Sequence, residues 1–263
     1  MIGTETLPAP PPVATVRLMP REHGAYYQFF APLLAAFMST RVTLAGVAFA
    51  WAAGAAFLAH EPLLAYFGKR GRRAQRTQAA FYRQRLAWLV AQLITAGSGG
   101  LYLASAEVRL AAIGVAVIGL IVTGISLRKP RGMAGEIGAS VVFAFFGTPV
   151  ALAGGMDVST AATVGVAWAI AFAMGVVSVR GILAVHRQGK LHAGWIELGI
   201  GLALLSALMM CGKAAIASAV LPLVCANIVF RVWAPSPKHL KFIGYGLVGA
   251  TVLSAVLLAR AVR

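Results

Sequence analysis

Acidic residues are the scarcest charged class in this chain. Only 7 Asp and Glu stand against 23 Lys and Arg among 263 residues, and charged residues of both signs make up 11% of the sequence. A soluble domain is closer to about a quarter charged, so the composition argues against an ordinary soluble globular protein. Because acids are so few, each one that lies beside an apolar segment requires an explanation.

Cysteine is also scarce, and the two residues present, Cys211 and Cys225, lie inside apolar segments. Their separation is neither a zinc-site spacing nor a secreted disulfide framework, so we interpret both as packing residues. The amino-terminal "MIGTETLPAPPPVATVRL" lacks a basic stretch followed by an apolar core, so we do not read it as a signal peptide. Its prolines predict a disordered cytoplasmic tail over residues 1–19.

What the chain has in excess is apolar sequence, at 60% hydrophobic residues and a mean hydropathy of +0.83. The excess falls in blocks of about 18 to 25 residues, the length of a helix that crosses a hydrocarbon core of roughly 30 Å. We therefore predict an all-α polytopic transmembrane bundle, forming one domain over residues 20–263. The nine predicted spans are 23–39, 43–60, 84–105, 108–127, 136–155, 160–183, 194–212, 214–232 and 240–260.

The basic residues are distributed unequally between the two sides that nine spans define. Eighteen lie in the amino-terminal tail and in the segments after the even-numbered spans, and five lie on the opposite side. Cytoplasmic segments of membrane proteins carry the excess of Lys and Arg, so we expect a protein of the bacterial cytoplasmic membrane with a cytoplasmic amino terminus. This asymmetry accounts for the net charge of +16 without a nucleic-acid partner. The cluster "GKRGRRAQR" has a further reading, as a site for anionic lipid head groups or a pyrophosphate.

Four acids lie at the edges of predicted spans. Glu22, Glu136 and Glu197 stand at cytoplasmic helix starts, where the helix dipole favours a carboxylate. Glu61 lies where a span ends, which the dipole does not favour. It stands between His60 and Pro62, and we expect the proline to break the helix and let His60 and Glu61 face one cavity. The alternative is an ion pair between Glu61 and a neighbouring Lys or Arg.

Arg180 lies inside an apolar stretch that ends in "VRGILAVHRQGK". A buried Arg requires a carboxylate partner, and Glu22, Glu61 and Glu136 are the candidates. We therefore predict a polar pocket that opens to the cytoplasm. Its predicted lining is Glu22, His23, His60, Glu61, Glu136, Arg180 and His186. Histidine and carboxylates are common metal ligands, so Glu22, Glu61 and Glu136 are candidate ligands, while a salt-bridge network without a ligand is the alternative.

Two stretches carry a resemblance to a known family. "PREHGAYYQFFAPLL" and "HEPLLAYFGKRGRR" resemble the YwiC-like family of bacterial membrane proteins. The resemblance is expected to extend over nearly the whole chain after the tail. Members of that family are largely uncharacterised, so the resemblance implies a membrane protein and little about its activity.

A weaker resemblance connects the chain with UbiA-type intramembrane prenyltransferases. "GEIGASVVFAFFGTPVALAG" is similar to the fifth-span signature of the naphthoate-prenylating branch, and "AHEPLLAYFGKRGRR" and "VRGILAVHRQGK" stand where those enzymes carry two aspartate-rich motifs. The resemblance implies a UbiA-like helix arrangement. The aspartates that hold magnesium and the prenyl diphosphate are missing, although Arg and Lys also bind a diphosphate directly.

The resemblance implies a lipid-linked transfer, with an isoprenoid or anionic lipid as partner and magnesium as candidate cofactor. Glu61 and Glu136 would hold metal or orient substrate, Arg180 would neutralise phosphate, and His60 or His186 would serve as acid or base. The expected substrate-binding residues are Glu22, His23, Arg72, Arg73, His186 and Lys190. Two alternatives stay open, which are an ion or solute transporter using the same groups and a structural membrane protein.

Overall fold

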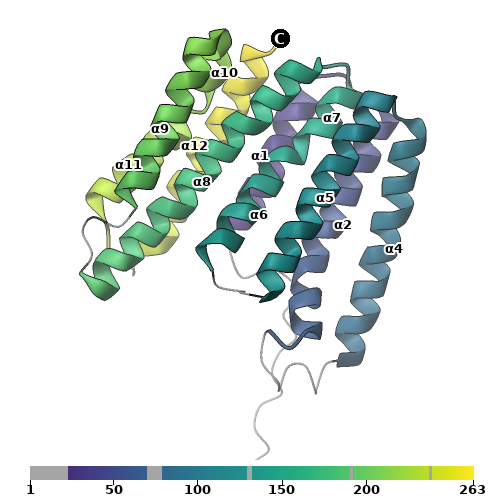
Figure 1. Cartoon of the computed structure of the whole chain (residues 1–263), viewed down its shortest axis with the longest axis horizontal. Helices are drawn as coiled ribbons and strands as arrows, with labels where there is room; N and C mark the ends of the chain where they lie inside the picture. The colour runs from purple at the N-terminus through teal and green to yellow at the C-terminus, as the bar shows by residue number, and fades with distance from the viewer. Residues whose placement is uncertain (1–22, 70–78, 129–131, 190–191, 193, 237–238) are drawn as a thin grey trace, which may run out of the picture.

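The computed structural model describes residues 23–69, 79–128, 132–189, 192, 194–236 and 239–263, and within these residues every regular element is a helix (Figure 1). The all-helical prediction is therefore confirmed. The tail predicted over residues 1–19 lies outside the described residues.

Short connections join helices that run back and forth along one direction, as expected for neighbours in a bundle. The helices are α1 (His23–Ser39), α2 (Leu44–Tyr66), α4 (Ala79–Leu103), α5 (Ala106–Arg128), α6 (Met133–Phe145), α7 (Gly147–Ala153), α8 (Val158–Gln188), α9 (Trp195–Leu208), α10 (Ala214–Ala219), α11 (Leu221–Trp233) and α12 (Leu240–Ala261), with a π-helical turn at Met209–Lys213.

In the described residues, seven helical segments are long and apolar enough to cross a membrane. Their outer faces are apolar as well, and in α5 only Val108 is buried. Outward-facing apolar helices are stable in lipid and not in water, so the chain is an integral membrane protein. The predicted count of nine crossings stays a prediction, because α1 and α11 are shorter than the other segments.

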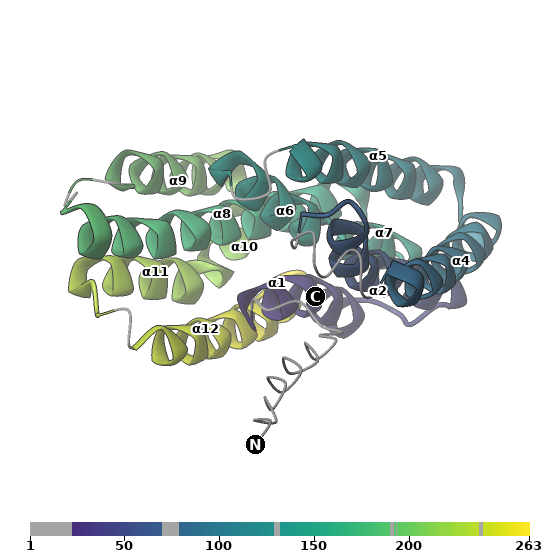
Figure 2. The same cartoon turned by 90° about the horizontal axis from the view of Figure 1, so that it is seen from below.

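The predicted turn between the seventh and eighth spans is present at Cys211 and Gly212. Gly212 has a φ of +77°, a left-handed conformation that glycine adopts without strain. The chain reverses there, so that α9 and α11 run in opposite directions, and both pack against α8, which lies between them (Figure 2).

One expectation about the second span was wrong. Pro62 does not break the helix, because α2 continues through it from Leu44 to Tyr66. The proline removes the backbone N–H that would bond to the carbonyl of Leu58, yet Pro62 is fully buried. Packing of its ring therefore keeps the helix intact, and His60 and Glu61 lie within α2 about 100° apart around the helix axis.

The bundle has two apolar cores, and α1 and α6 lie between them (Figure 2). Ala31 and Ala35 of α1 belong to the core built with α8 to α12, whereas Phe29 and Leu33 belong to the core built with α2 and α7. Glycine permits the closest helix contacts here, as expected for a bundle in lipid. A Cβ added to Gly147 would lie 2.5 Å from the carbonyl oxygen of Pro32.

The two ends of the bundle differ in chemistry, and we name each after an acidic residue. The Asp157 end holds the connections before α2 and α8 and the carboxyl-terminal Arg263. There Asp157 caps α8 by accepting a 2.9 Å hydrogen bond from the backbone N–H of Thr160. The opposite, Glu136 end holds the start of α6 and the ends of α2 and α8 (Figure 1). Those sequence-predicted site residues that the structure describes, among them Glu61, Glu136 and Arg180, belong to the Glu136 end.

Candidate functional site

The centre of the Glu136 end is an ion pair between Arg180 of α8 and Glu136 of α6. Arg180 Nε donates to Glu136 Oε2 at 2.6 Å, and Nη2 donates to Oε1 at 2.7 Å. A guanidinium that bonds both carboxylate oxygens is fixed in orientation as well as in charge. The side chains are 34% and 40% exposed, so other groups can reach them.

The local sequence places both partners. Glu136 lies in the first turn of α6, where the exposed backbone N–H groups favour a carboxylate. Arg180 lies on the side of α8 that packs against α6. The two readings of Glu136 from sequence, as a helix-start acid and as a partner of Arg180, are therefore both present. Of the three acids considered for Arg180, Glu136 is the one that bonds it.

One helical turn further along α6, a second polar contact connects this helix to α1. Ser140, which is 2% exposed, donates a 3.1 Å hydrogen bond to the side-chain oxygen of Gln28. Sequence reasoning missed Gln28, although an amide in an apolar helix is a usable signal for a buried polar contact. The bond fixes α1 beside the Glu136–Arg180 pair.

A second group of polar side chains lies where α1, α2 and α4 meet. Glu61 and Arg85 both interact electrostatically with the hydroxyl of Tyr26. The ring of Tyr26 packs edge-on against Phe57, one turn before Glu61, with centroids 5.2 Å apart. His60 also has an interaction within the structure. Neither Tyr26 nor Arg85 was predicted as a site residue. Arg85 was counted among the basic residues of the segment that follows the second predicted span.

His186, which was predicted to line the polar pocket, contacts a neighbouring helix. Its Nε2 lies 2.8 Å from the carbonyl oxygen of Ala234, at the end of α11. On α11, one turn before Ala234, the buried guanidinium of Arg231 lies 5.0 Å from the ring centroid of Trp195 in a cation–π contact. These residues hold α8, α9 and α11 together, and neither Arg231 nor Trp195 was predicted as a site residue.

Several predicted residues are not placed by the structure. Glu22, Arg72, Arg73 and Lys190 lie outside the described residues, and His23 begins α1 without a described side chain. The pocket that they were expected to line therefore stays a prediction. Within the described part of the chain, no three His, Cys, Asp or Glu side chains converge in a way that would hold a metal ion, so we derive no step through magnesium.

The family model of YwiC-like proteins matches residues 19–152. This chain belongs to the YwiC-like family. The match covers half of the YwiC-like chain and includes Glu61, Arg85 and Glu136, whereas Arg180 lies beyond it. No curated protein and no solved structure matches this YwiC-like protein. The UbiA-like helix arrangement is not confirmed and stays a prediction.

Proposed function

We propose that this YwiC-like protein binds the diphosphate of an isoprenoid lipid at the Glu136 end and supports transfer of the prenyl group. The observation that carries the proposal is the Glu136–Arg180 pair, in which a partly exposed guanidinium is already oriented by two bonds. Such a fork matches phosphate oxygens as well as carboxylate oxygens. A diphosphate would take the place of Glu136 as the partner of Arg180.

In the proposed reaction, the bond between the prenyl carbon and the diphosphate oxygen breaks as a nucleophile attacks that carbon. The negative charge collects on the leaving diphosphate, and Arg180 stabilises it. Arg72, Arg73 and Lys190 are proposed to add positive charge. Glu61 would orient the nucleophile, and His60 or His186 would take its proton.

The proposed orientation places the Glu136 end in the bacterial cytoplasm. Among the described basic residues, eight lie toward this end, namely Lys69, Arg83, Arg85, Arg128, Arg180, Arg187, Arg231 and Lys241, and five lie toward the Asp157 end, namely Arg41, Arg109, Lys213, Arg260 and Arg263. The larger number of basic residues on the first side supports this orientation. Water-soluble diphosphate would then leave on the cytoplasmic side.

A second candidate function is transport of an ion or a solute. It is favoured by the Tyr26, Glu61 and Arg85 group, because ionisable side chains between apolar helices commonly mark transport pathways. A purely structural role for the two groups is the third possibility. Substitution of Arg180 or Glu61 separates the structural role from the other two, because a structural role predicts loss of folding, whereas prenyl transfer and transport predict a folded but inactive protein.

The test is thermal unfolding of the purified protein in detergent with geranylgeranyl diphosphate and magnesium. A ligand that binds the folded state raises Tm in a saturable way. We expect such a rise in the wild-type protein and in Arg260→Gln, an exposed arginine at the Asp157 end. The rise should be lost in folded Arg180→Gln, and geranylgeraniol, which lacks the diphosphate, should give none. Equal shifts with the alcohol and the diphosphate would contradict a diphosphate site.

A further inference from the structure

Exposed aromatic side chains gather at the Glu136 end of the bundle. In the described part of the chain, the exposed aromatic residues within about one turn of a helix terminus at this end are Tyr66, Phe67, Phe81, Trp195, Trp233 and Phe242. We call these residues the aromatic girdle. At the Asp157 end, the described residues place only Tyr102 in the same way. The two ends of the bundle therefore differ in aromatic content.

The aromatic girdle is spread around the bundle. Its members come from the ends of α2, α4, α9, α11 and α12. Figure 2 shows α2 and α4 on one side of the bundle and α9, α11 and α12 on the other. A protein partner covers one contiguous apolar patch, whereas a membrane leaflet surrounds the bundle. The distribution of the girdle therefore fits lipid better than a single protein partner.

The two tryptophans of the aromatic girdle lie close to the same depth along the bundle. His186 Nε2 in the last turn of α8 lies 2.8 Å from the carbonyl oxygen of Ala234, the residue after Trp233. On the same end of α11, the Arg231 guanidinium lies 5.0 Å from the ring centroid of Trp195. These contacts bring the ends of α8, α9 and α11 together, so Trp195 and Trp233 belong to one level of the structure.

Exposed basic residues stand beside the aromatic girdle in three places. They are Lys69, Arg83 and Lys241, which lie within two residues of Phe67, Phe81 and Phe242. A long basic side chain next to an aromatic ring at the membrane surface can reach lipid phosphate. The other end differs, because Arg109 near Tyr102 donates hydrogen bonds to the carbonyl oxygens of Leu101 and Tyr102 and so caps α4.

We propose that the aromatic girdle, with Lys69, Arg83 and Lys241, binds anionic phospholipid head groups and seats the Glu136 end in the head-group layer of one leaflet. Tyr and Trp favour this layer because one part of each ring system is apolar and another is polar. Basic residues close to an anionic leaflet are attracted to its phosphates. The proposal does not depend on binding of a prenyl diphosphate by Arg180.

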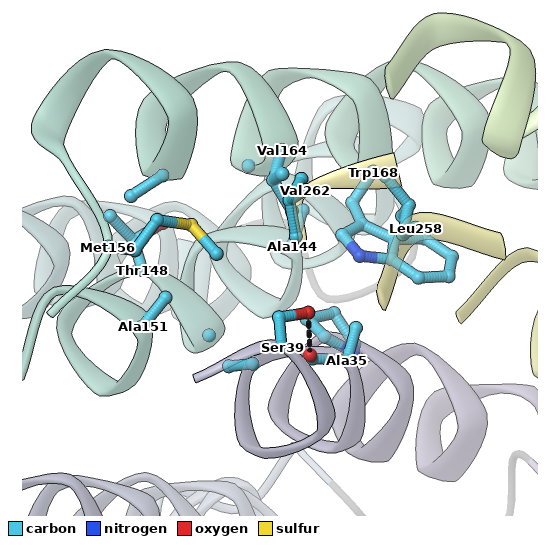
Figure 3. Close-up of a pocket in the computed structure, with 15 residues that line it drawn as sticks. Ala35, Ser39, Ala144, Thr148, Ala151, Met156, Val164, Trp168, Leu258 and Val262 are labelled. Atoms are coloured by element: carbon cyan, nitrogen blue, oxygen red, sulfur yellow. Dashed lines mark hydrogen bonds between the residues drawn. The ribbon is translucent and has the colours of Figure 1, made fainter. Parts of the chain in front are cut away.

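The first test is quenching of tryptophan fluorescence in vesicles whose lipids carry a nitroxide either at the head group or near the end of an acyl chain. The signal of Trp233 is the difference between wild type and Trp233→Phe. Trp88 is the matched control, read from Trp88→Phe, because the two side chains are 69% and 66% exposed and Trp88 lies in the middle of α4. Figure 3 shows Trp168 inside the bundle beside Leu258, where neither lipid can reach it.

We expect the head-group nitroxide to quench Trp233 most and the acyl-chain nitroxide to quench Trp88 most. Trp168 should be quenched by neither. Stronger quenching of Trp233 by the acyl-chain nitroxide would place the girdle inside the hydrocarbon core and overturn the proposal. Protection of Trp233 from both nitroxides would do the same, because a second protein chain rather than lipid would then cover the girdle.

The second test asks whether the head groups are anionic. The vesicles contain phosphatidylglycerol and phosphatidylcholine, and one or the other carries a nitroxide close to the glycerol. Labelled phosphatidylglycerol should quench Trp233 more strongly than labelled phosphatidylcholine. This preference should fall by up to about fivefold in Lys241→Gln, the contribution of one Lys near an anionic surface, because Lys241 begins the helix that packs against α11.

Arg260→Gln is the control for Lys241→Gln, since it removes an exposed cation from the opposite end of the same helix, α12. The preference for phosphatidylglycerol should persist in this variant. Equal quenching by the two labelled lipids in wild-type protein would contradict a site for anionic head groups. An equal loss of preference in the two variants would contradict it as well, because the effect would then follow net charge and not the girdle.

Discussion

Arg180 and Glu136 are separated by 44 positions in the chain and meet through two charge-assisted hydrogen bonds of 2.6 and 2.7 Å. The pair joins α8 to α6 at the end of the bundle where the sequence predicts function. The Arg180 side chain is 34% exposed and the Glu136 side chain is 40% exposed, so solvent or lipid head groups screen the pair. Its contribution to stability is therefore modest, about 1 kcal/mol or less.

Glu136→Gln is expected to lower Tm by a few degrees, since it leaves Arg180 with a neutral partner. Glu197→Gln serves as the control, because Glu197 also lies in a first helical turn and is exposed. Its Tm should stay close to wild type. The measurement is thermal unfolding in detergent at neutral pH, and equal losses for both variants would attribute the effect to the helix dipole alone.

The charge-swapped variant Glu136→Arg with Arg180→Glu is a sharper check of the same pair. It restores opposite charges across the contact but places a cation in the first turn of α6, which the dipole disfavours. We expect a Tm between those of the wild type and the worse single variant. A double variant as unstable as the two losses added together would show that the contact itself contributes nothing.

Gly147→Ala is expected to destabilise the bundle strongly. The new Cβ would lie 2.5 Å from the backbone oxygen of Pro32, and neither helix can move without losing its packing. Gly124→Ala is the matched control, because its Cβ has no heavy atom within 4 Å. In the control the change removes helical glycine and should stabilise by about 0.5–1 kcal/mol. Opposite signs of the two Tm shifts test the closeness of α1 and α7.

A buried contact between α8 and α11 gives a further prediction. Ser178 is 1% exposed and donates a 2.7 Å hydrogen bond to the backbone carbonyl of Asn227. Ser178→Ala should cost about 0.5–1.5 kcal/mol in the free energy of unfolding. Ser206→Ala, which removes an exposed bond within one helix, should cost less. Chemical unfolding of both variants in the same detergent distinguishes these outcomes, and equal losses would argue against an interhelical role.

The loss of thermal stability at acidic pH should depend on Asp157. Hydrogen bonds from the side chain and then the backbone of Thr160 lower the pKa of this carboxyl group below its usual value. A lowered folded-state pKa stabilises the protein above the unfolded pKa of about 4, and this contribution is lost as pH falls through the folded value. Asp157→Asn retains a good cap and has no carboxyl group to titrate. The Tm difference between wild type and variant should shrink below about pH 4, and a difference that is constant with pH would contradict the assignment.

The sequence predicted the helices and the residue types of the site better than the partners within it. Apolar block length located the membrane helices because crossing lipid imposes a minimum length. The sequence also predicted that Arg180 pairs with a carboxylate, since an unpaired cation is costly among apolar helices. The sequence could not predict that Glu136 rather than Glu61 is the partner of Arg180, because this depends on α6 packing beside α8.

Local rules failed where tertiary packing overrides them. Pro62 predicted a broken helix, yet its burial keeps α2 continuous. Arg85 and Arg231 were counted as loop charges, whereas both lie inside helices and Arg231 packs on Trp195. Counting charges assigns a side of the membrane, and it carries no information about which ring or carboxylate the charge contacts.

The most direct test of the central claim is equilibrium binding of geranylgeranyl diphosphate to nanodisc-reconstituted protein in three forms. In our account Glu136 competes with phosphate for Arg180. Glu136→Gln should therefore bind more tightly than wild type, and Arg180→Gln should bind at least about tenfold more weakly, a difference of about 1.4 kcal/mol. Unchanged affinity in both folded variants would contradict the account, because the guanidinium would then hold α6 and α8 together without contacting the lipid diphosphate.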